Sequence, residues 1–142
     1  LYGAARMTGE NLTYVAYGYG DEKGNPLSIE RRTNAERQLR LSLIHGMGEL
    51  LLLQYALIRY VECTSHQQLS LICSDRIYTL HGQELNLDLY TGLQDEKVRW
   101  ISAFHKQRFR TPEEDAVIIH RFETIDLREA ARREGTTGDM NS

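Results

Sequence analysis

The sequence has few of the residues and patterns that point to a specific class of protein. Its 142 residues include only two cysteines, two prolines and one tryptophan. The cysteines, Cys63 and Cys73, are too few for the disulfide framework of a small secreted domain, and neither forms a CxxC pair. Positive charge is not in excess either, because 17 Lys and Arg oppose 20 Asp and Glu, a net charge of −3. We therefore do not expect nucleic-acid binding through bulk charge.

Long hydrophobic runs are also missing. The longest run begins at Leu50 and is interrupted by Gln54, well short of the ~20 residues that a membrane-spanning helix needs. The first residues do not combine a basic start with a long apolar stretch, so no secretory signal is visible. We therefore expect a soluble, intracellular protein of the cytoplasm. Residues 1–142 fit a single domain with its own core, with flexible ends at 1–10 and 136–142.

The first two-thirds of the chain, residues 11–92, have the patterns of β-strands. Alternation of apolar and polar residues predicts half-buried strands, and runs rich in β-forming residues predict further ones. The expected strands are 12–19, 27–31, 39–43, 50–62, 69–71, 77–80 and 85–89. Turn-forming residues separate them at 20–26, 46–48, 65–68 and 81–83. Short connections of this kind predict an antiparallel sheet with one solvated face.

Residues 34–62 carry conflicting signals. Thr33 and Glu36 match a helix capping box, whereas the following segment from Leu39 to Leu43 alternates with a period of two. One turn of helix leading into a strand satisfies both patterns. The alternative is an all-helical chain with helices over 34–62 and 66–81, for which far-UV circular dichroism would report a helix content well above half.

After Gly92 the apolar spacing changes to that of a helix. Val98, Ile101 and Phe104 repeat at helical intervals, which predicts an amphipathic helix. A second helix is predicted to begin at Thr111, with a proline at its first position and a capping-box glutamate. The apolar positions of this second helix are Ile118, Phe122 and Ile125. With residues 94–134 helical, we expect an α+β fold: an antiparallel β-rich sheet or barrel closed by one or two C-terminal helices.

No motif for catalysis, a cofactor or a metal is assembled in the sequence. The five histidines are dispersed, and Cys63-x-x-His66 offers half a zinc site without a second pair at usable spacing. Cys63 and Cys73 are better interpreted as small apolar residues than as metal ligands or nucleophiles. We therefore predict no cofactor, no metal and no catalytic residue.

Two sets of side chains are candidates for binding. Basic residues of the first third can contact an anionic lipid head group or a partner: Lys23, Arg31, Arg32, Arg37 and Arg40. Tyrosines and histidines from separate segments can line a pocket beneath the sheet: Tyr14, Tyr17, His45, His81 and His105.

The stretch from Leu85 to Arg108 contains Glu-Lys-Val-Arg-Trp-Ile-Ser-Ala-Phe at 96–104. It resembles the last strand and closing helix of pleckstrin-homology domains, especially those that follow the catalytic domain in Dbl-type Rho exchange factors. The resemblance covers about a quarter of the chain and implies a β-barrel in which Trp100 plugs the core. Phosphoinositide-binding members have a basic β1–β2 loop, whereas residues 20–26 hold only Lys23 beside two acids. The resemblance therefore implies contact with a protein more than tight lipid binding.

Together these observations predict a non-catalytic binding or regulatory module that recognises a protein partner or, weakly, an anionic membrane surface. The alternative is a small α+β enzyme or ligand-binding domain whose pocket uses the tyrosines and a histidine. A cavity of a few hundred Å³ that contains a histidine would favour this alternative, and a filled core would count against it.

Overall fold

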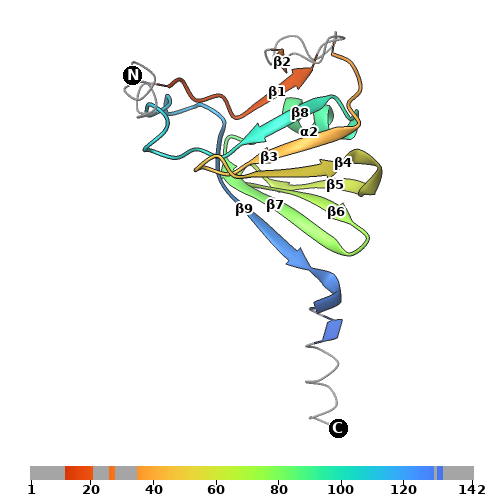
Figure 1. Ribbon diagram of the computed structural model, residues 1–142. Coiled ribbons are helices and arrows are strands. Elements are labelled where there is room, and N and C mark those ends of the chain that lie inside the picture. Colours follow the sequence, from red (N-terminus) through yellow and green to blue (C-terminus); the bar gives the residue numbers. More distant parts are fainter. Residues whose placement is uncertain (1–11, 21–25, 28–34, 130, 133–142) are drawn as a thin grey trace, which may run out of the picture.

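The computed structural model describes residues 12–20, 26–27, 35–129 and 131–132. Two β-sheets make up most of this chain (Figure 1). The strands of the first sheet are β1 (Tyr17–Gly20), β2 (Pro26–Leu27), β3 (Arg40–Ile44), β4 (Leu50–Gln54) and β8 (Val98–Ser102). Those of the second sheet are β5 (Ile58–Ser65), β6 (Gln68–Cys73), β7 (Arg76–Gln83) and β9 (Ile118–Asp126). One α-helix, α2 (Leu87–Gln94), contacts β5 and β8.

The strand orders are β2-β1-β8-β3-β4 and β5-β6-β7-β9. Only β3 and β8 pair in parallel, and the other neighbours are antiparallel. The fold is therefore a β-rich α+β fold, as expected, but it is not a closed barrel. The all-helical alternative is wrong.

Alternating apolar residues predicted β3 and β6, and a run of β-forming residues predicted β7. Leu41 and Leu43 of β3 are fully buried, as are Leu69 and Leu71 of β6. Leu80 of β7 joins the same core. Burying each leucine contributes about 1.5–3 kcal/mol, which fixes the register of these strands. The predicted turn between β3 and β4 is confirmed, and Gly48 there has φ +97°, a conformation that suits glycine.

The apolar run 50–62, predicted as one strand, is divided between the two sheets. A single turn of 3-10 helix (Tyr55–Leu57) separates β4 from β5. Tyr55 is buried there, and its hydroxyl donates to the carbonyl oxygen of Val98 at 2.6 Å. This hydrogen bond anchors the corner at which the chain leaves the first sheet for the second.

The strand predicted over residues 85–89 is wrong, because α2 begins within it. Asn86 caps the helix by accepting a hydrogen bond from the backbone nitrogen of Leu89 at 2.9 Å. Leu89 and Leu93 are buried and lie four residues apart, one helical turn, whereas Leu87 is 75% exposed. The three alternating leucines therefore reflect the start of a helix and not a strand.

The helix predicted after Gly92 is wrong as well, because β8 occupies 98–102. Gly18 of β1 pairs with Trp100 and Tyr19 pairs with Val98, so β8 contains a bulge. The extra residue lets Val98 and Ile101 both face the core, which imitates the i, i+3 spacing of a helix. Trp100 lies half-buried with its ring against Gly18, where a Cβ would come within 2.6 Å of the ring, and this differs from the expected core plug.

The second predicted helix, from Thr111 to Glu134, is replaced mainly by β9. Within that stretch, only residues 127–129 and 131–132 of the described chain are helical. Phe122 pairs with Leu80 and Ile125 with Ile77, so the two side chains face opposite sides of the sheet and do not form one apolar stripe.

The turn predicted over residues 81–83 is wrong, because these residues belong to β7. Gly82 is required because a Cβ there would lie 2.0 Å from the Ile118 carbonyl oxygen.

Candidate functional site

The predicted basic cluster can be placed only in part. Lys23, Arg31 and Arg32 lie outside the described residues. Arg37 forms an exposed ion pair with Glu96, with 2.8 Å between Nη2 and Oε1. Arg40 is exposed at the start of β3. An exposed pair such as Arg37–Glu96 stabilises the fold by at most about 1 kcal/mol, so it does not prevent the guanidinium from meeting another anion.

Tyr14, a predicted pocket residue, has a structural role. Its hydroxyl donates to the Ser102 carbonyl oxygen at 2.6 Å and accepts from the backbone nitrogen of Ile119 at 2.9 Å. Burial raises the pKa of this hydroxyl well above the usual range. The phenol therefore stays protonated and joins β8 to β9.

Tyr17 is fully buried and takes part in a second polar network. Its hydroxyl donates to Oδ2 of Asp88 at 2.9 Å, and the hydroxyl of Tyr19 donates to the same oxygen at 2.6 Å. Asp88 lies in the first turn of α2. Hydrogen bonds to a carboxylate are the strong ones, so these two tyrosines anchor α2 to β1.

The three predicted histidines do not gather in one site. His45 packs edge-on against Phe122, with ring centroids 5.1 Å apart. His81 pairs with Glu123 at 2.8 Å between Nε2 and Oε1, on a partly exposed part of the second sheet. His105 follows β8, and its Nδ1 accepts from the backbone nitrogen of Gln107 at 3.1 Å.

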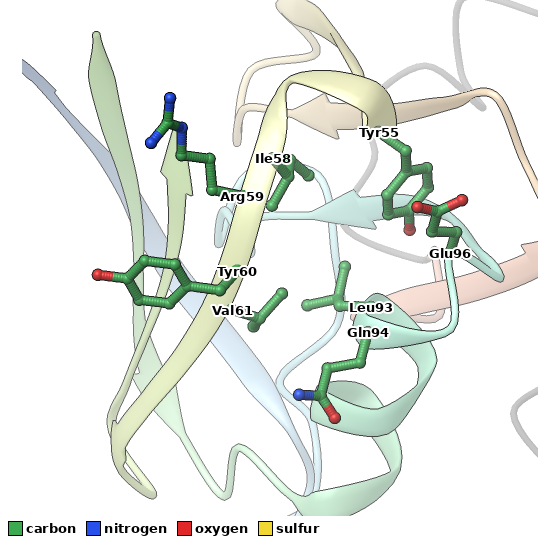
Figure 2. A pocket seen from close by; sticks show the side chains of 8 residues that line it. All are labelled: Tyr55, Ile58, Arg59, Tyr60, Val61, Leu93, Gln94 and Glu96. Atoms are coloured by element: carbon green, nitrogen blue, oxygen red, sulfur yellow. The ribbon is translucent and has the colours of Figure 1, made fainter. Parts of the chain in front are cut away.

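The structure places two hollows between β5 and α2, and none of the five predicted pocket residues lines either one. Figure 2 shows the smaller hollow, of about 220 Å³, at the start of β5. Val61 and Leu93 point toward each other across it, while Arg59 and Tyr60 point away on the far side of β5. Its lining residues are Tyr55, Ile58, Arg59, Tyr60, Val61, Leu93, Gln94 and Glu96.

The larger hollow, of about 530 Å³, lies at the end of β5 and the start of α2. Its lining residues are Cys63, Ser65, His66, Leu85, Asn86, Leu87 and Tyr90. Cys63 is exposed, and its thiol donates to the Ser65 carbonyl oxygen at 3.4 Å. Apolar and polar groups thus surround a space within the range of roughly 300–1,000 Å³ that is typical of ligand sites.

We call the two hollows together the β5–α2 groove. Sequence reasoning missed the groove because it took residues 85–89 for a strand and placed no helix beside β5. The signal was present: Asn86 is a good N-cap, Asp88 is a first-turn acid, and Leu85, Leu89 and Leu93 follow at intervals of four.

The described residues contain no group of three or more His, Cys, Asp or Glu side chains that could hold a metal ion. Cys73, on β6, is buried, and burial raises the pKa of its thiol. No helix of the described chain has both the length and the apolar character to cross a membrane.

Comparisons with known proteins give no family. No family model, no curated protein and no solved structure matches the chain.

Proposed function

We propose that the chain is a non-catalytic binding module that recognises a protein partner by taking an extended segment of it into the β5–α2 groove. The observation that carries the proposal is the alignment of the two hollows along the same strand and the same helix. Together they span residues 58–66 of β5 and the hairpin that follows, about 26 Å at ~3.3 Å per residue.

The backbone of β5 supports this mode of recognition. β5 is the edge strand of its sheet, and no described strand pairs with its outer side. An extended segment can therefore add to the edge through main-chain hydrogen bonds while its alternate side chains enter the two hollows. Such a segment needs about eight residues to reach both.

The floor of the groove supports apolar contacts. Val61, Leu85 and Leu93 are all at most 7% exposed and form its base. Around them lie Gln94, Glu96 and His66, which supply hydrogen-bonding groups at the rim. An apolar base with a polar rim is the usual anatomy of a protein-recognition surface.

A hollow-filling substitution tests the proposal. Nine-residue segments selected from a displayed peptide library are measured against the purified chain by fluorescence anisotropy. Cys63→Tyr places a large side chain in the larger hollow and is expected to weaken binding by at least about tenfold. Thr64→Tyr is the matched control, because Thr64 is exposed but lines neither hollow. Equal binding by the wild type and Cys63→Tyr, or no selected segment at all, contradicts the proposal.

A second candidate function is favoured by the volume of the larger hollow. A space of about 530 Å³ that includes His66 and Tyr90 suits a small molecule, although neither side chain was among the predicted pocket residues. A thermal-shift screen of small aromatic compounds with the wild type and Tyr90→Ala separates the two functions. A ligand-binding domain is favoured if a compound binds the wild type, does not bind Tyr90→Ala and is not displaced by any selected peptide.

The anionic membrane surface is tested separately. Co-sedimentation with vesicles containing phosphatidylserine at low salt compares the wild type with Arg40→Ala. Equal sedimentation with neutral and anionic vesicles removes the membrane from the candidate partners.

A further inference from the structure

Exposed large hydrophobic side chains concentrate in one part of the described chain. Six of the ten lie within residues 39–60: Leu39, Met47, Leu50, Leu52, Leu57 and Tyr60. Four of these follow β4 and its two ends: Met47 is 61% exposed, Leu50 58%, Leu52 55% and Leu57 56%. Isolated exposed leucines are ordinary, but a row of them along one strand marks an interaction surface.

The backbone of β4 presents hydrogen-bonding groups along the same row. Backbone hydrogen bonds join His45 to Glu49 and Leu39 to Tyr55 at the two ends of the β3–β4 hairpin. Because hydrogen-bonded pairs alternate in an antiparallel ladder, Leu51 and Leu53 bond to β3.

The intervening residues of β4 are Leu50, Leu52 and Gln54, which direct their N–H and C=O groups away from β3. No described strand pairs with that side. We call the strand and its flanking apolar side chains the β4 edge; it consists of Met47, Leu50, Leu52, Gln54 and Leu57.

We propose that the β4 edge pairs with the β4 edge of a second copy of this chain. The two strands run antiparallel about a twofold axis at Leu52, and the two five-stranded sheets become one continuous sheet. This pairing is independent of the function proposed for the β5–α2 groove.

The sequence of the strand is complementary to itself in this arrangement. Leu52 lies opposite Leu52 of the second copy, and Leu50 lies opposite Gln54, so no charge enters the pairing. The outward side chains of both copies fall on the same face of the joined sheet, where the leucines form one apolar stripe. The Met47 end of one copy lies beside the Leu57 end of the other, which extends the apolar contact beyond the paired strands.

Charge favours the antiparallel arrangement over a parallel one. Glu49 precedes Leu50 at one end of β4, and Arg40 pairs with Gln54 at the other. Twofold antiparallel pairing brings the Arg40 end of each copy beside the Glu49 end of the other. A parallel pairing would instead place like charges together at both ends.

Sedimentation equilibrium on the full chain tests the association. At about 100 μM, a concentration at which even weak self-association is populated, the wild type is expected to have a molecular mass twice the 16.4 kDa of the single chain. Leu52→Lys removes the two leucines that contact each other at the twofold axis and places two cations opposite each other, and it is expected to weaken the dimer at least about 100-fold.

Leu87→Lys is the matched control, because Leu87 is 75% exposed but lies on α2, away from the β4 edge. It is expected to leave the dimer intact while altering the larger hollow of the groove. A failure of the dimer proposal can therefore be distinguished from a failure of the proposal for the β5–α2 groove. Far-UV circular dichroism establishes that both variants are folded.

Cross-linking tests the register. In a Cys63→Ser background, Leu52→Cys is expected to form an intermolecular disulfide under mild oxidation, because directly opposite residues have Cα atoms about 5.5 Å apart. Leu50→Cys is the control, since its two symmetry-related positions are offset by four residues, about 13 Å.

A monomeric wild type at about 100 μM overturns the proposal. So does a dimer that survives Leu52→Lys, or equal cross-linking by Leu50→Cys and Leu52→Cys. A monomer whose Leu52→Lys variant loses binding to a displayed peptide would assign the β4 edge to a different protein instead.

Discussion

β4 and β5 are consecutive strands, both at the edge of a sheet, yet they are built in opposite ways. β5 carries Arg59 and Glu62 on exposed positions, has two irregularities in its register, and is contacted by α2. β4 has no charge, no proline and no irregularity in its pairing with β3. Charges and bulges are features by which natural proteins keep an edge strand from pairing with the same edge of a second copy. β4 is therefore the edge suited to self-pairing, whereas β5 is suited to a short segment of a different protein.

β9, the other edge of the second sheet, resembles β5. It carries His120, Arg121 and Glu123, and it contains an irregularity where it pairs with His81 and Gly82 of β7. Two of these three edge strands therefore carry features that oppose pairing with the same strand of a second copy. This difference indicates that exposure of the leucines on β4 is a property of that edge and not of the whole fold.

The largest effect on the free energy of unfolding is expected when a leucine on the buried face of β4 is compared with one on its exposed face. Leu53→Ala removes a side chain that is 4% exposed and should lower the free energy of unfolding by about 2–4 kcal/mol. Leu52→Ala, one residue away and 55% exposed, should change it by less than ~0.5 kcal/mol at concentrations that keep the chain monomeric. Urea unfolding measures both, and comparable losses would show that β4 does not have one buried and one exposed face.

A smaller effect is expected when the packing of α2 against β5 is weakened. Asp88→Asn replaces the carboxylate that accepts from Tyr17 and Tyr19, and we expect a loss of about 1–3 kcal/mol because charge-assisted hydrogen bonds are replaced by neutral ones. With α2 loosened, amide hydrogen exchange should accelerate in β5 and leave β4 unchanged. Asp115→Asn, at an exposed loop residue, is the control. Unchanged exchange in β5 would indicate that the packing of α2 does not stabilise that strand.

The reactivity of the two cysteines differs between an edge strand and an interior strand. Cys63 of β5 is exposed, whereas Cys73 of β6 is buried, and burial and then the charge of Asp75 raise the pKa of its thiol. Because the thiolate is the reactive form, we expect a thiol reagent at pH 8 to label one site per folded chain quickly and the second only on unfolding. Cys63→Ser should abolish the fast phase, and its persistence would place the reactive thiol elsewhere.

The smallest effect is expected at the end of β9. The Asp126 carboxylate accepts from the backbone nitrogens of Glu129 at 3.2 Å and Arg128 at 3.0 Å, and these hydrogen bonds, that of Glu129 foremost, lower its pKa below the usual 3.8. A lowered pKa means that the stabilisation is present above about pH 4 and is lost as the pH falls through the folded value. The stability difference between the wild type and Asp126→Ala should therefore shrink in urea titrations below pH 4, and a constant difference would contradict this account.

The sequence predicted strands where apolar residues alternate or β-forming residues cluster, and β3, β6 and β7 lie in such segments. Turn-forming residues predicted the turns at 46–48 and 65–68. The prediction failed at β8, where an extra residue lets Val98 and Ile101 face the same side, and at β9, where Phe122 and Ile125 face opposite sides of the sheet. Which side a residue faces depends on the partner strand, so the spacing within one segment cannot reveal it.

The candidate site was missed for a related reason. None of the predicted pocket residues lines the β5–α2 groove, because the groove is formed by residues 55–66 and 85–96, which meet only after α2 folds against β5. The predicted basic set stays a prediction, since Lys23, Arg31 and Arg32 lie outside the described residues.

Composition and local pattern alone determined that this is a β-rich chain with leucine-lined strands, because a strand with one buried face must alternate. Only the tertiary structure decided which strands share a sheet and which edge remains unpaired. Those properties arise from contacts between residues far apart in the chain, and no local preference of a residue encodes them.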